Sequence, residues 1–550
     1  MRASLLAAWL FLGCGAVEPL AGGDLGGGAV DAISPGGWAD STSPGAVADS
    51  TSRAQFDVGV AVDGLGDATG SLLDAHEIAD DSLPGVDALA PDAGDDASPD
   101  VGGGTDTLDP PPTIGAFEVL VAAQDGVGID GFLTAWETPL CDGLRCLFVT
   151  VQAGAGEVLV LGDFNGWEGG EPLAPVPVRP DVWWGIVDMG SPALVEYKLR
   201  VDGAWKVDSS NVYFHFGPFG PNSAIYGPGS SRLRLIPGVW SSELANERDL
   251  YVYLPAAYFQ DETARFPVIY LQDGFNVFTN PAAPFGSWNV DVTADALMAD
   301  GRVAPAILVG IDTHDRFDEY LHAPIDLGEG VASAAKLDSY GAFVVGTVKP
   351  LVDSTLRTLP EPAHTGIAGS SLGGLSALYL AVTSPGIFGL CGSFSGSFWV
   401  GEKGDAAWAP SLREVIAQED PAPGAFRLYM DSGDQTFEGA VTYEADAWVY
   451  SDWTRNALIA RGWQGRPEWD TDGDLATPPV DLAPGTPPSE VPHLAWGPAV
   501  PPGFATWADW LGTDRDLLSM VGHGHVHNEA AWEKRFGAAL TFLLPGPAAP

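Results

Sequence analysis

The sequence predicts an α/β architecture for the carboxyl-terminal half of the chain, preceded by a β-sandwich and by a long segment without regular structure. Three observations predict it. The chain has 550 residues, too many for a single core. Short alternating apolar runs fill residues 147–201, and after residue 230 apolar strands alternate with longer helical segments. We therefore expect four parts, residues 1–14, 15–113, 114–229 and 230–550.

The first part has the features of an export signal. Arg2 is followed by an apolar run from Leu5 to Leu12, which is too short to span a bilayer as a permanent helix. Phe11-Leu12-Gly13-Cys14 is similar to a bacterial lipobox, in which the cysteine becomes the lipidated first residue, although Phe11 stands where Leu is commonest. We expect an exported outer-membrane lipoprotein anchored through Cys14, with an ordinary signal peptide as the alternative.

An acidic segment follows the signal. Residues 1–113 contain 19 acidic residues and only two basic ones, Arg2 and Arg53, among Gly, Ala, Ser and Pro. Such a composition cannot bury enough apolar surface to offset the entropy of ordering, so we expect residues 15–113 to form a disordered tether. The rest of the chain still holds 54 acidic against 23 basic residues. This balance argues against nucleic acid as a partner.

The sandwich is expected where β-branched and aromatic residues alternate with polar ones between turn residues. Its expected strands are Leu147–Val151, Val158–Leu161, Trp183–Val187 and Glu196–Val201. Cys141 and Cys146 flank a short loop, and they either pair after export or remain two free thiols. Cys391 lies in an apolar stretch and is expected in the core of the α/β part.

The α/β part is expected to hold a mostly parallel sheet covered by helices. The expected strands are Asp249–Leu254, Val268–Leu271, Ala306–Ile311, Gly366–Ala368 and Phe426–Met430. A stretch rich in Pro and Gly, residues 465–506, is expected to be an insertion loop.

A nucleophile elbow is the strongest motif. Residues 365–374 join an expected strand to an expected helix and contain Gly369-Ser370-Ser371-Leu372-Gly373. The turn is tight, so the residues two before and two after the nucleophile must be small. Ser371 meets this test, with Gly369 and Gly373, whereas Ser370 has Ala368 and Leu372. We therefore expect Ser371 to be the nucleophile of an α/β-hydrolase.

A serine nucleophile needs an imidazole base and a carboxylate that orients it, and in this fold they follow in the order Ser, acid, His. The acid is expected just after a downstream strand. Asp434 is our prediction, because Gly433 provides a turn, and Asp431 is the alternative. The base is expected in the Gly-rich stretch 522–532, which holds three histidines. Three such histidines could also bind a metal, but no other ligand cluster supports one, and no cofactor is expected.

Residues 230–548 resemble the "Putative esterase" family, which includes esterase D and enterochelin esterase-like proteins. The resemblance lies in His527-Asn-Glu-x-x-Trp532, in Asp273-Gly-Phe275-Asn276 and in Arg316-x-x-Glu319-Tyr320. It implies that His527 is the base, with His525 the alternative and His523 structural. It also implies that the amides of Phe275 and Leu372 form the oxyanion hole. For the Arg-x-x-Glu-Tyr segment we expect an internal ion pair.

The front part resembles the immunoglobulin-like early-set sandwiches that include family-48 carbohydrate-binding modules. The shared residues are Gly162-Asp-Phe-Asn-Gly-Trp167, Tyr197-Lys198, Asp202-Gly-Ala-Trp205 and Pro221-Asn222-Ser. The resemblance implies sugar binding by Trp167, Lys198, Trp205 and Asn222. Aromatic faces suit the apolar face of a pyranose, and a lysine and an amide can bond its hydroxyls. The alternative is that the two tryptophans only pack the module or shape the esterase pocket.

Together these features predict a serine carboxylic-ester hydrolase that forms an acyl-enzyme on an ester-substituted glycan of acetyl or feruloyl type. One alternative is a ferric-siderophore esterase. The acidic catalytic part supplies few cations for an anionic catecholate, so the charge favours the glycan ester. An alternative of another class is a catalytically idle glycan-binding surface lipoprotein.

Overall fold

The computed structural model describes residues 113–546 except 191–193, 329–330, 403–409, 438, 440–444, 465–515 and 523. The predicted signal, Cys14, the predicted tether and the predicted insertion loop lie outside the described residues.

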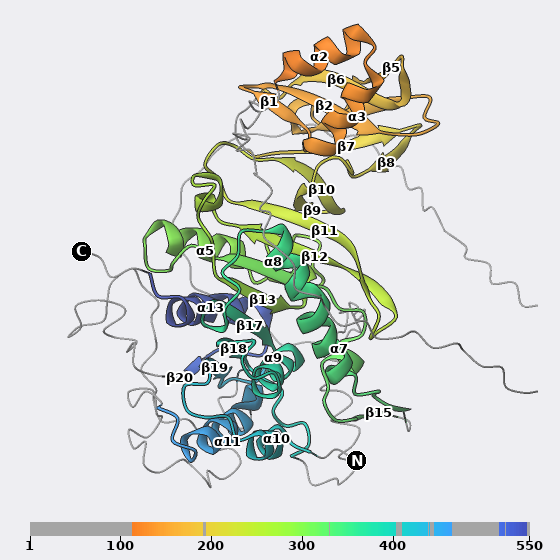
Figure 1. Cartoon of the computed structure of the whole chain (residues 1–550). Coiled ribbons are helices and arrows are strands. Elements are labelled where there is room, and N and C mark those ends of the chain that lie inside the picture. The colour runs from red at the N-terminus through yellow and green to blue at the C-terminus, as the bar shows by residue number, and fades with distance from the viewer. Residues whose placement is uncertain are drawn as a thin grey trace, which may run out of the picture. The chain divides into compact units, whose positions relative to one another are not determined.

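Two sheets form the front module (Figure 1). One has the order β1 (Leu140–Asp142), β2 (Arg145–Val151), β6 (Arg179–Asp188), β5 (Ala174–Val176). The other contains β4 (Glu171–Pro172), β3 (Val158–Gly162), β7 (Val195–Val201), β10 (Gly220–Ile225) and β9 (Tyr213–Gly217), with β8 (Ala204–Lys206) paired to β7. The sheets share a core, in which Phe148 of β2 and Tyr197 of β7 meet edge to face at 5.0 Å. All four expected strands lie within β2, β3, β6 and β7.

Two helices before the first strand were not expected. Helix α2 (Ile114–Ala123) begins at Thr113 and α3 (Gly126–Ala135) at Asp125, and both capping side chains accept a hydrogen bond from the first turn. Phe117 of α2 and Phe132 of α3 are buried together with Leu147 and Val149 of β2. The helices therefore cover the face of the first sheet that points away from the second. A disulfide joins Cys141 to Cys146 across β1 and β2.

The second sheet of the module continues into the sheet of the α/β domain. Strand β11 pairs with β9 on one side, where Leu233 faces Phe214, and with β12 on the other. From β11 the order is β12, β14, β13, β17, β18, β19, β20. The bounds are β11 (Arg232–Ser241), β12 (Asn246–Leu254), β13 (Val268–Gln272), β14 (Ile307–Ile311), β17 (Thr365–Ser370), β18 (Leu390–Phe394), β19 (Arg427–Gly433) and β20 (Leu517–Gly522).

The six strands from β14 to β20 are parallel, and β11 and β12 run antiparallel to their neighbours. This confirms the predicted α/β-hydrolase class. Strands β11, β18 and β20 were not among the expected strands.

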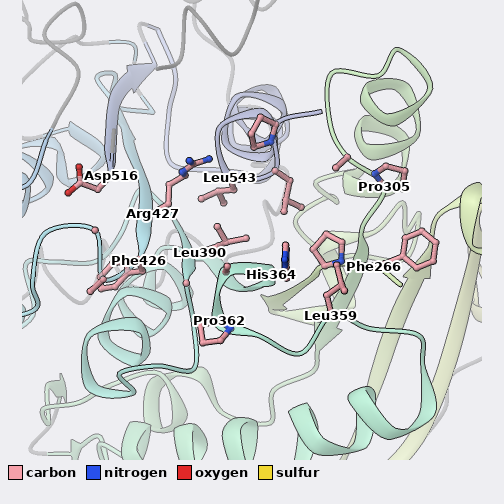
Figure 2. Close-up of a pocket in the computed structure, with 18 of the residues that line it drawn as sticks. Phe266, Pro305, Leu359, Pro362, His364, Leu390, Phe426, Arg427, Asp516 and Leu543 are labelled. Atoms are coloured by element: carbon pink, nitrogen blue, oxygen red, sulfur yellow. The ribbon is translucent and has the colours of Figure 1, made fainter. Parts of the chain in front are cut away.

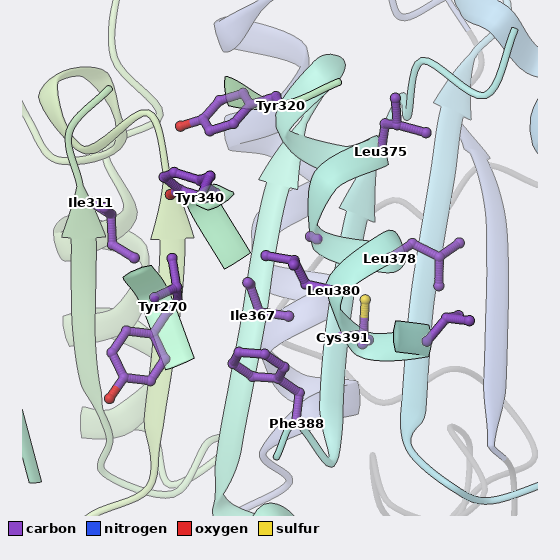
Figure 3. Packing of buried hydrophobic residues seen from close by; sticks show 14 of the residues in the cluster. Tyr270, Ile311, Tyr320, Tyr340, Ile367, Leu375, Leu378, Leu380, Phe388 and Cys391 are labelled. Atoms are coloured by element: carbon purple, nitrogen blue, oxygen red, sulfur yellow. The ribbon is translucent and has the colours of Figure 1, made fainter. Parts of the chain in front are cut away.

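Helices cover both faces of this sheet (Figure 1). One layer contains α7 (Leu337–Phe343), α8 (Lys349–Thr355), α9 (Leu372–Thr383), α10 (Leu412–Glu419) and α11 (Trp448–Ile459), and the other contains α5 (Val290–Ala299) and α13 (Glu529–Leu543). Because strand residues alternate between faces, Tyr270 of β13 packs in the first layer and Ile269 and Leu271 in the second. Figure 3 shows the first layer, with α9 over the strands and Cys391 buried in the core as predicted. Within the described part of the chain, no helix combines the length and apolarity needed to cross a membrane.

Candidate active site

Ser371 occupies a strained turn between β17 and α9. Its φ is +55° and its ψ is −121°, a left-handed conformation that a non-glycine residue seldom adopts. A Cβ on Gly369 would lie 2.7 Å from the backbone of Gly373, so this crossing requires glycine. Ser370, by contrast, lies within β17 and is buried. The backbone thus forms the elbow that we predicted, with Ser371 at its tip.

A loop after β18 holds the nucleophile. The amide of Ser371 donates to the carbonyl of Phe394 at 2.9 Å, and the amide of Ser397 donates to the carbonyl of Ser371 at 2.9 Å. The two hydroxyl oxygens of Ser371 and Ser397 lie 3.3 Å apart. The same loop also contacts Asp446, because Ser395 Oγ donates to Asp446 Oδ2 at 2.6 Å.

His527 is paired with a buried carboxylate. Its Nδ1 is hydrogen-bonded to Oδ1 of Asp446, and the backbone amide of Gly433 donates to Oδ2 of the same carboxylate. Burial opposes ionisation of Asp446, but His527, Arg535 and Ser395 together hold the pKa of this carboxyl below its usual value. A carboxylate on Nδ1 leaves Nε2 as the ring nitrogen that can accept a proton. His527 therefore has the partner that a general base needs.

Asp446 takes the place that we predicted for Asp434, and the prediction is corrected accordingly. Asp434 does follow β19, but its Oδ1 accepts a hydrogen bond from the amide of Gly524 at 2.7 Å. Asp431, the alternative acid, pairs with Arg535 at 2.9 Å. The carboxylate bonded to His527 lies farther along the chain, in the short turn Ala445–Ala447 that precedes α11. Ala445 precedes it in the sequence, so a rule that looks for a glycine turn just after a strand does not select it.

The two amides predicted to form an oxyanion hole lie at the starts of two helices. Leu372 is the first residue of α9, and Phe275 is the second residue of α4 (Gly274–Val277), which follows β13. First-turn amides have no acceptor within their own helix. Strands β13 and β17 are direct neighbours, so both helix starts lie at the same edge of the sheet. A Cβ on Gly274 would lie 2.7 Å from the backbone of Gly310, so α4 can approach the sheet only with glycine there.

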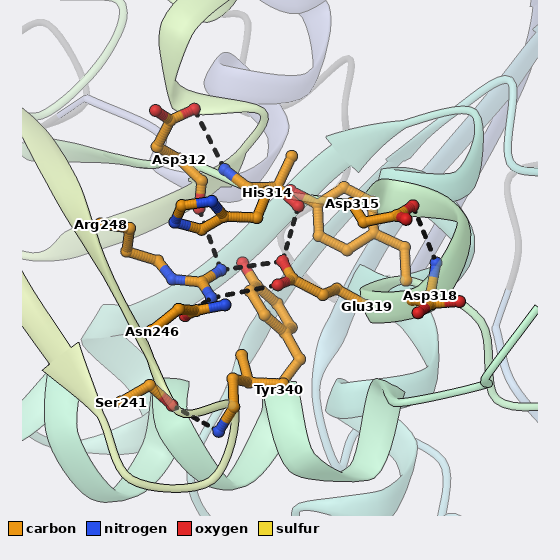
Figure 4. Close-up of polar contacts among 12 residues, drawn as sticks. Ser241, Asn246, Arg248, Asp312, His314, Asp315, Asp318, Glu319 and Tyr340 are labelled. Carbon is orange, nitrogen blue, oxygen red and sulfur yellow. Dashed lines mark hydrogen bonds and ion pairs between the residues drawn. The ribbon is translucent and has the colours of Figure 1, made fainter. Parts of the chain in front are cut away.

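The Arg-x-x-Glu-Tyr segment forms internal ion pairs, as predicted. Glu319 binds the guanidinium of Arg248 through two hydrogen bonds of 2.9 and 3.1 Å, and both side chains are buried (Figure 4). Arg316 pairs with Asp273 at 3.0 Å, and Tyr320 Oη accepts from the amide of Asp273. Because Asp273 precedes α4 directly, these contacts fix the helix that carries Phe275.

The four predicted sugar-binding residues lie on the outer face of the second sheet. The rings of Trp167 and Trp205 lie 6.2 Å apart, inclined at 48°. Trp205 of β8 pairs with Arg200 of β7. Lys198 lies two residues before Arg200 on the same strand, so the side chains of Lys198, Arg200 and Trp205 share one face of the sheet. Trp205 is 50% exposed, which a purely packing role does not require. Asn222 lies on the same face, because its neighbour Ser223 pairs with the inward-facing Tyr197, but its side chain is buried and already donates to Glu196 at 2.6 Å.

A cavity of about 1050 Å³ lies at the opposite edge of the sheet (Figure 2). Its walls come from residues at or before the amino ends of the parallel strands, including Phe266, His364, Leu390, Arg427 and Asp516. Ligands of open α/β sheets bind at the carboxyl ends of the strands, where Ser371 lies. This cavity is therefore separate from the candidate site.

Of the other two histidines in the Gly-rich stretch, His525 lies with Nδ1 3.3 Å from NH1 of Arg535, and His523 is outside the described residues. No group of three His, Cys, Asp or Glu residues in the described ranges is arranged to hold a metal ion.

The chain is similar to known esterases and to an uncharacterized protein. Residues 241–461 match the family described as "Putative esterase". The uncharacterized protein YbbA of Bacillus subtilis is 28% identical over 200 residues, covering 36% of this chain and 72% of its own length. The iron(III) enterobactin esterase of Dickeya dadantii is 26% identical over 335 residues, covering 54% of this chain and 68% of its own length. The endo-1,4-beta-xylanase/feruloyl esterase of Xylanibacter ruminicola is 26% identical over 179 residues, covering 30% of this chain and 22% of its own length.

Proposed function

We propose that the α/β domain, which belongs to the "Putative esterase" family and is a carboxylic ester hydrolase, forms an acyl-enzyme on Ser371. The observation that carries the proposal is the connection between nucleophile and base. The loop 395–397 binds Ser371 at one end and Asp446 at the other, and Asp446 binds His527. One loop thus sets the positions of all three side chains.

The chemistry follows from these positions. Ser371 Oγ attacks the ester carbonyl while His527 Nε2 accepts its proton, and the amides of Leu372 and Phe275 stabilise the oxyanion. The same proton passes to the departing alkoxide, which leaves as an alcohol and gives the acyl-enzyme. Water then attacks the acyl group, with His527 again accepting the proton, and releases the acid and free Ser371. Asp446 stays ionised throughout and orients the imidazole.

The substrate that we propose is an ester-substituted glycan carrying acetyl or feruloyl groups. The pairing of half-exposed Trp205 with partly buried Trp167, with Lys198 on the same face, supports a sugar site on the front module. Similarity to a protein named endo-1,4-beta-xylanase/feruloyl esterase supports the ester type. Asn222 does not strengthen this proposal, because its amide is bonded to Glu196.

A ferric-siderophore esterase is the second candidate, supported by the similarity to an iron(III) enterobactin esterase. The net charge of −48 opposes an anionic ligand, which places the glycan ester first. Purified protein should be assayed against acetyl, feruloyl and catecholate esters, with Ser371→Ala as the blank. A preference for catecholate esters would favour the ferric-siderophore esterase over the glycan esterase. Wild-type turnover no higher than that of Ser371→Ala on every ester would favour an idle binding protein.

We also propose that the chain is exported and anchored through a lipid on Cys14. The disulfide between Cys141 and Cys146 supports export, because disulfides persist in oxidising compartments.

A further inference from the structure

A buried arginine lies beside the acid of the proposed triad. Arg535 on α13 is 3% exposed, and its Nε binds Asp431 Oδ2 at 2.9 Å. Its NH2 group donates to Ser395 Oγ at 2.7 Å and lies 3.8 Å from Asp446 Oδ2. Arg535 thus contacts Asp446 directly and also through the hydroxyl of Ser395.

Asp431 is the second carboxylate of this cluster. It is buried, and it accepts hydrogen bonds from Tyr429 Oη at 2.7 Å and from the amide of Ser395 at 3.0 Å. Two carboxylates and one guanidinium therefore share one buried region. Together with a neutral His527, these groups carry a formal charge of −1. The sum becomes zero once the imidazole has taken the proton of Ser371.

We propose that Arg535 is a positioning residue for the pair formed by His527 and Asp446, and that Asp431 is its counter-charge. The proposal rests on the proposed triad. Arg535 balances one of the two carboxylates, so that a single uncompensated negative charge faces the imidazole. Arg535 also holds the Ser395 hydroxyl against Asp446 Oδ2, the carboxylate oxygen that does not contact His527.

The alternative arrangement without Arg535 is unfavourable. Two carboxylates that share a buried site repel each other, which raises the pKa of both carboxyls. If Asp446 were protonated, it would be neutral, and His527 Nδ1 would lose its anionic hydrogen-bond acceptor. Arg535 prevents this, and it contributes to holding the pKa of Asp446 below its usual value.

Other ionisable groups also face this cluster and are part of the charge balance. They come from β19, from the loop before α13 and from α13 itself: Tyr429, His525 and Glu529. None of them is altered in the variants below, so their contribution is common to all samples.

The test is the pH profile of kcat/KM with a p-nitrophenyl ester in full-length protein, for Arg535→Met, Asp431→Asn and the double variant. Loss of a cation favours the imidazolium, so Arg535→Met should move the acid limb to higher pH by about one unit. Loss of an anion disfavours it, so Asp431→Asn should move the limb to lower pH. The double variant should return the limb close to that of wild type, and Arg535→Lys should leave it close to wild type.

The control is Arg248→Met, which breaks a buried ion pair of similar exposure elsewhere in the domain. It should alter stability without moving the acid limb. Acid limbs that stay at the wild-type pH, or that move in the same direction in Arg535→Met and Asp431→Asn, would overturn the proposal. If Arg535→Met does not fold, the direction of the shift in Asp431→Asn still tests the proposal. Failure of the triad itself would be recognised separately, by turnover that persists in His527→Ala and Asp446→Ala.

Discussion

Replacement of Asp446 by asparagine is the sharpest test of the corrected acid. In the structure, Oδ2 of Asp446 accepts hydrogen bonds from the amide of Gly433 and from Ser395 Oγ. A backbone amide can only donate, so the carbonyl oxygen of the new side chain must take this position. The NH2 group of the new side chain would then face His527 Nδ1. That nitrogen would have to accept, and the proton of the neutral ring would move to Nε2.

A ring with its proton on Nε2 cannot accept the proton of Ser371. We therefore expect kcat for a short p-nitrophenyl ester to fall by about 10³–10⁴-fold, which corresponds to roughly 4–5.5 kcal/mol of transition-state stabilisation. KM should change little, because Asp446 does not contact the substrate. The assay is steady-state kinetics at a pH on the plateau of the wild-type profile.

Asp434→Asn is the matched control. The amide of Gly524 donates to its Oδ1, and an amide oxygen accepts that bond equally well. This variant should retain most of the wild-type kcat. If Asp446→Asn remained fully active while Asp434→Asn lost activity, the acid would be Asp434 and the pairing deduced above would be refuted.

The other predictions concern the nucleophile, the front module and the anchor. Ser371→Ala should remove p-nitrophenyl ester hydrolysis while Ser370→Ala keeps most of it, and equal loss in both would contradict the elbow assignment. Trp205→Ala should abolish retention on an insoluble polysaccharide with small-ester turnover intact, whereas parallel loss of both would indicate a packing role. Cys14→Ser should release the protein from membranes of the producing cell, as judged by fractionation and lipid labelling, and unchanged fractionation would refute the anchor. Burial raises the pKa of Asp208 to about 6, so its ionisation costs folding free energy and wild-type stability should fall as the pH rises from about 4 to 7. Asp208→Asn should remove that fall, worth about 3 kcal/mol, in urea unfolding at a series of pH values, and an unchanged slope would contradict it.

The parts of the fold that were predicted are those whose sequence pattern is local. The elbow is an example, because Gly369 and Gly373 are required by contacts within a few residues of Ser371. The buried strands β13 and β14 are continuous apolar runs, and they were predicted nearly to the residue. His527, the predicted base, was selected through a short motif, and it lies just before α13.

The parts that were missed depend on contacts between distant segments. Strand β18 reads Leu390-Cys-Gly-Ser-Phe394, with small and polar residues that are buried because β17, β19 and α13 surround them. Helices α2 and α3 contain several glycines, and they are packed against a sheet that forms only later in the chain. Asp446 reaches His527 across 81 residues of sequence. None of these contacts leaves a local signal.

The front module is joined to the catalytic domain by more than a linker, which bears on how binding and hydrolysis are divided. Strand β9 pairs with β11, so one sheet runs through both parts. On β9, the ring of Phe216 meets the ring of Phe275 of α4 edge to face at 5.8 Å. Phe275 carries one of the two proposed oxyanion amides, and its position therefore depends on a residue of the module. Trp205 of β8 and Trp167 of the turn after β3, by contrast, lie on the outer face of the same sheet. The module therefore supports the reacting carbonyl with one strand, while a different part of its surface is free to hold a remote portion of the substrate.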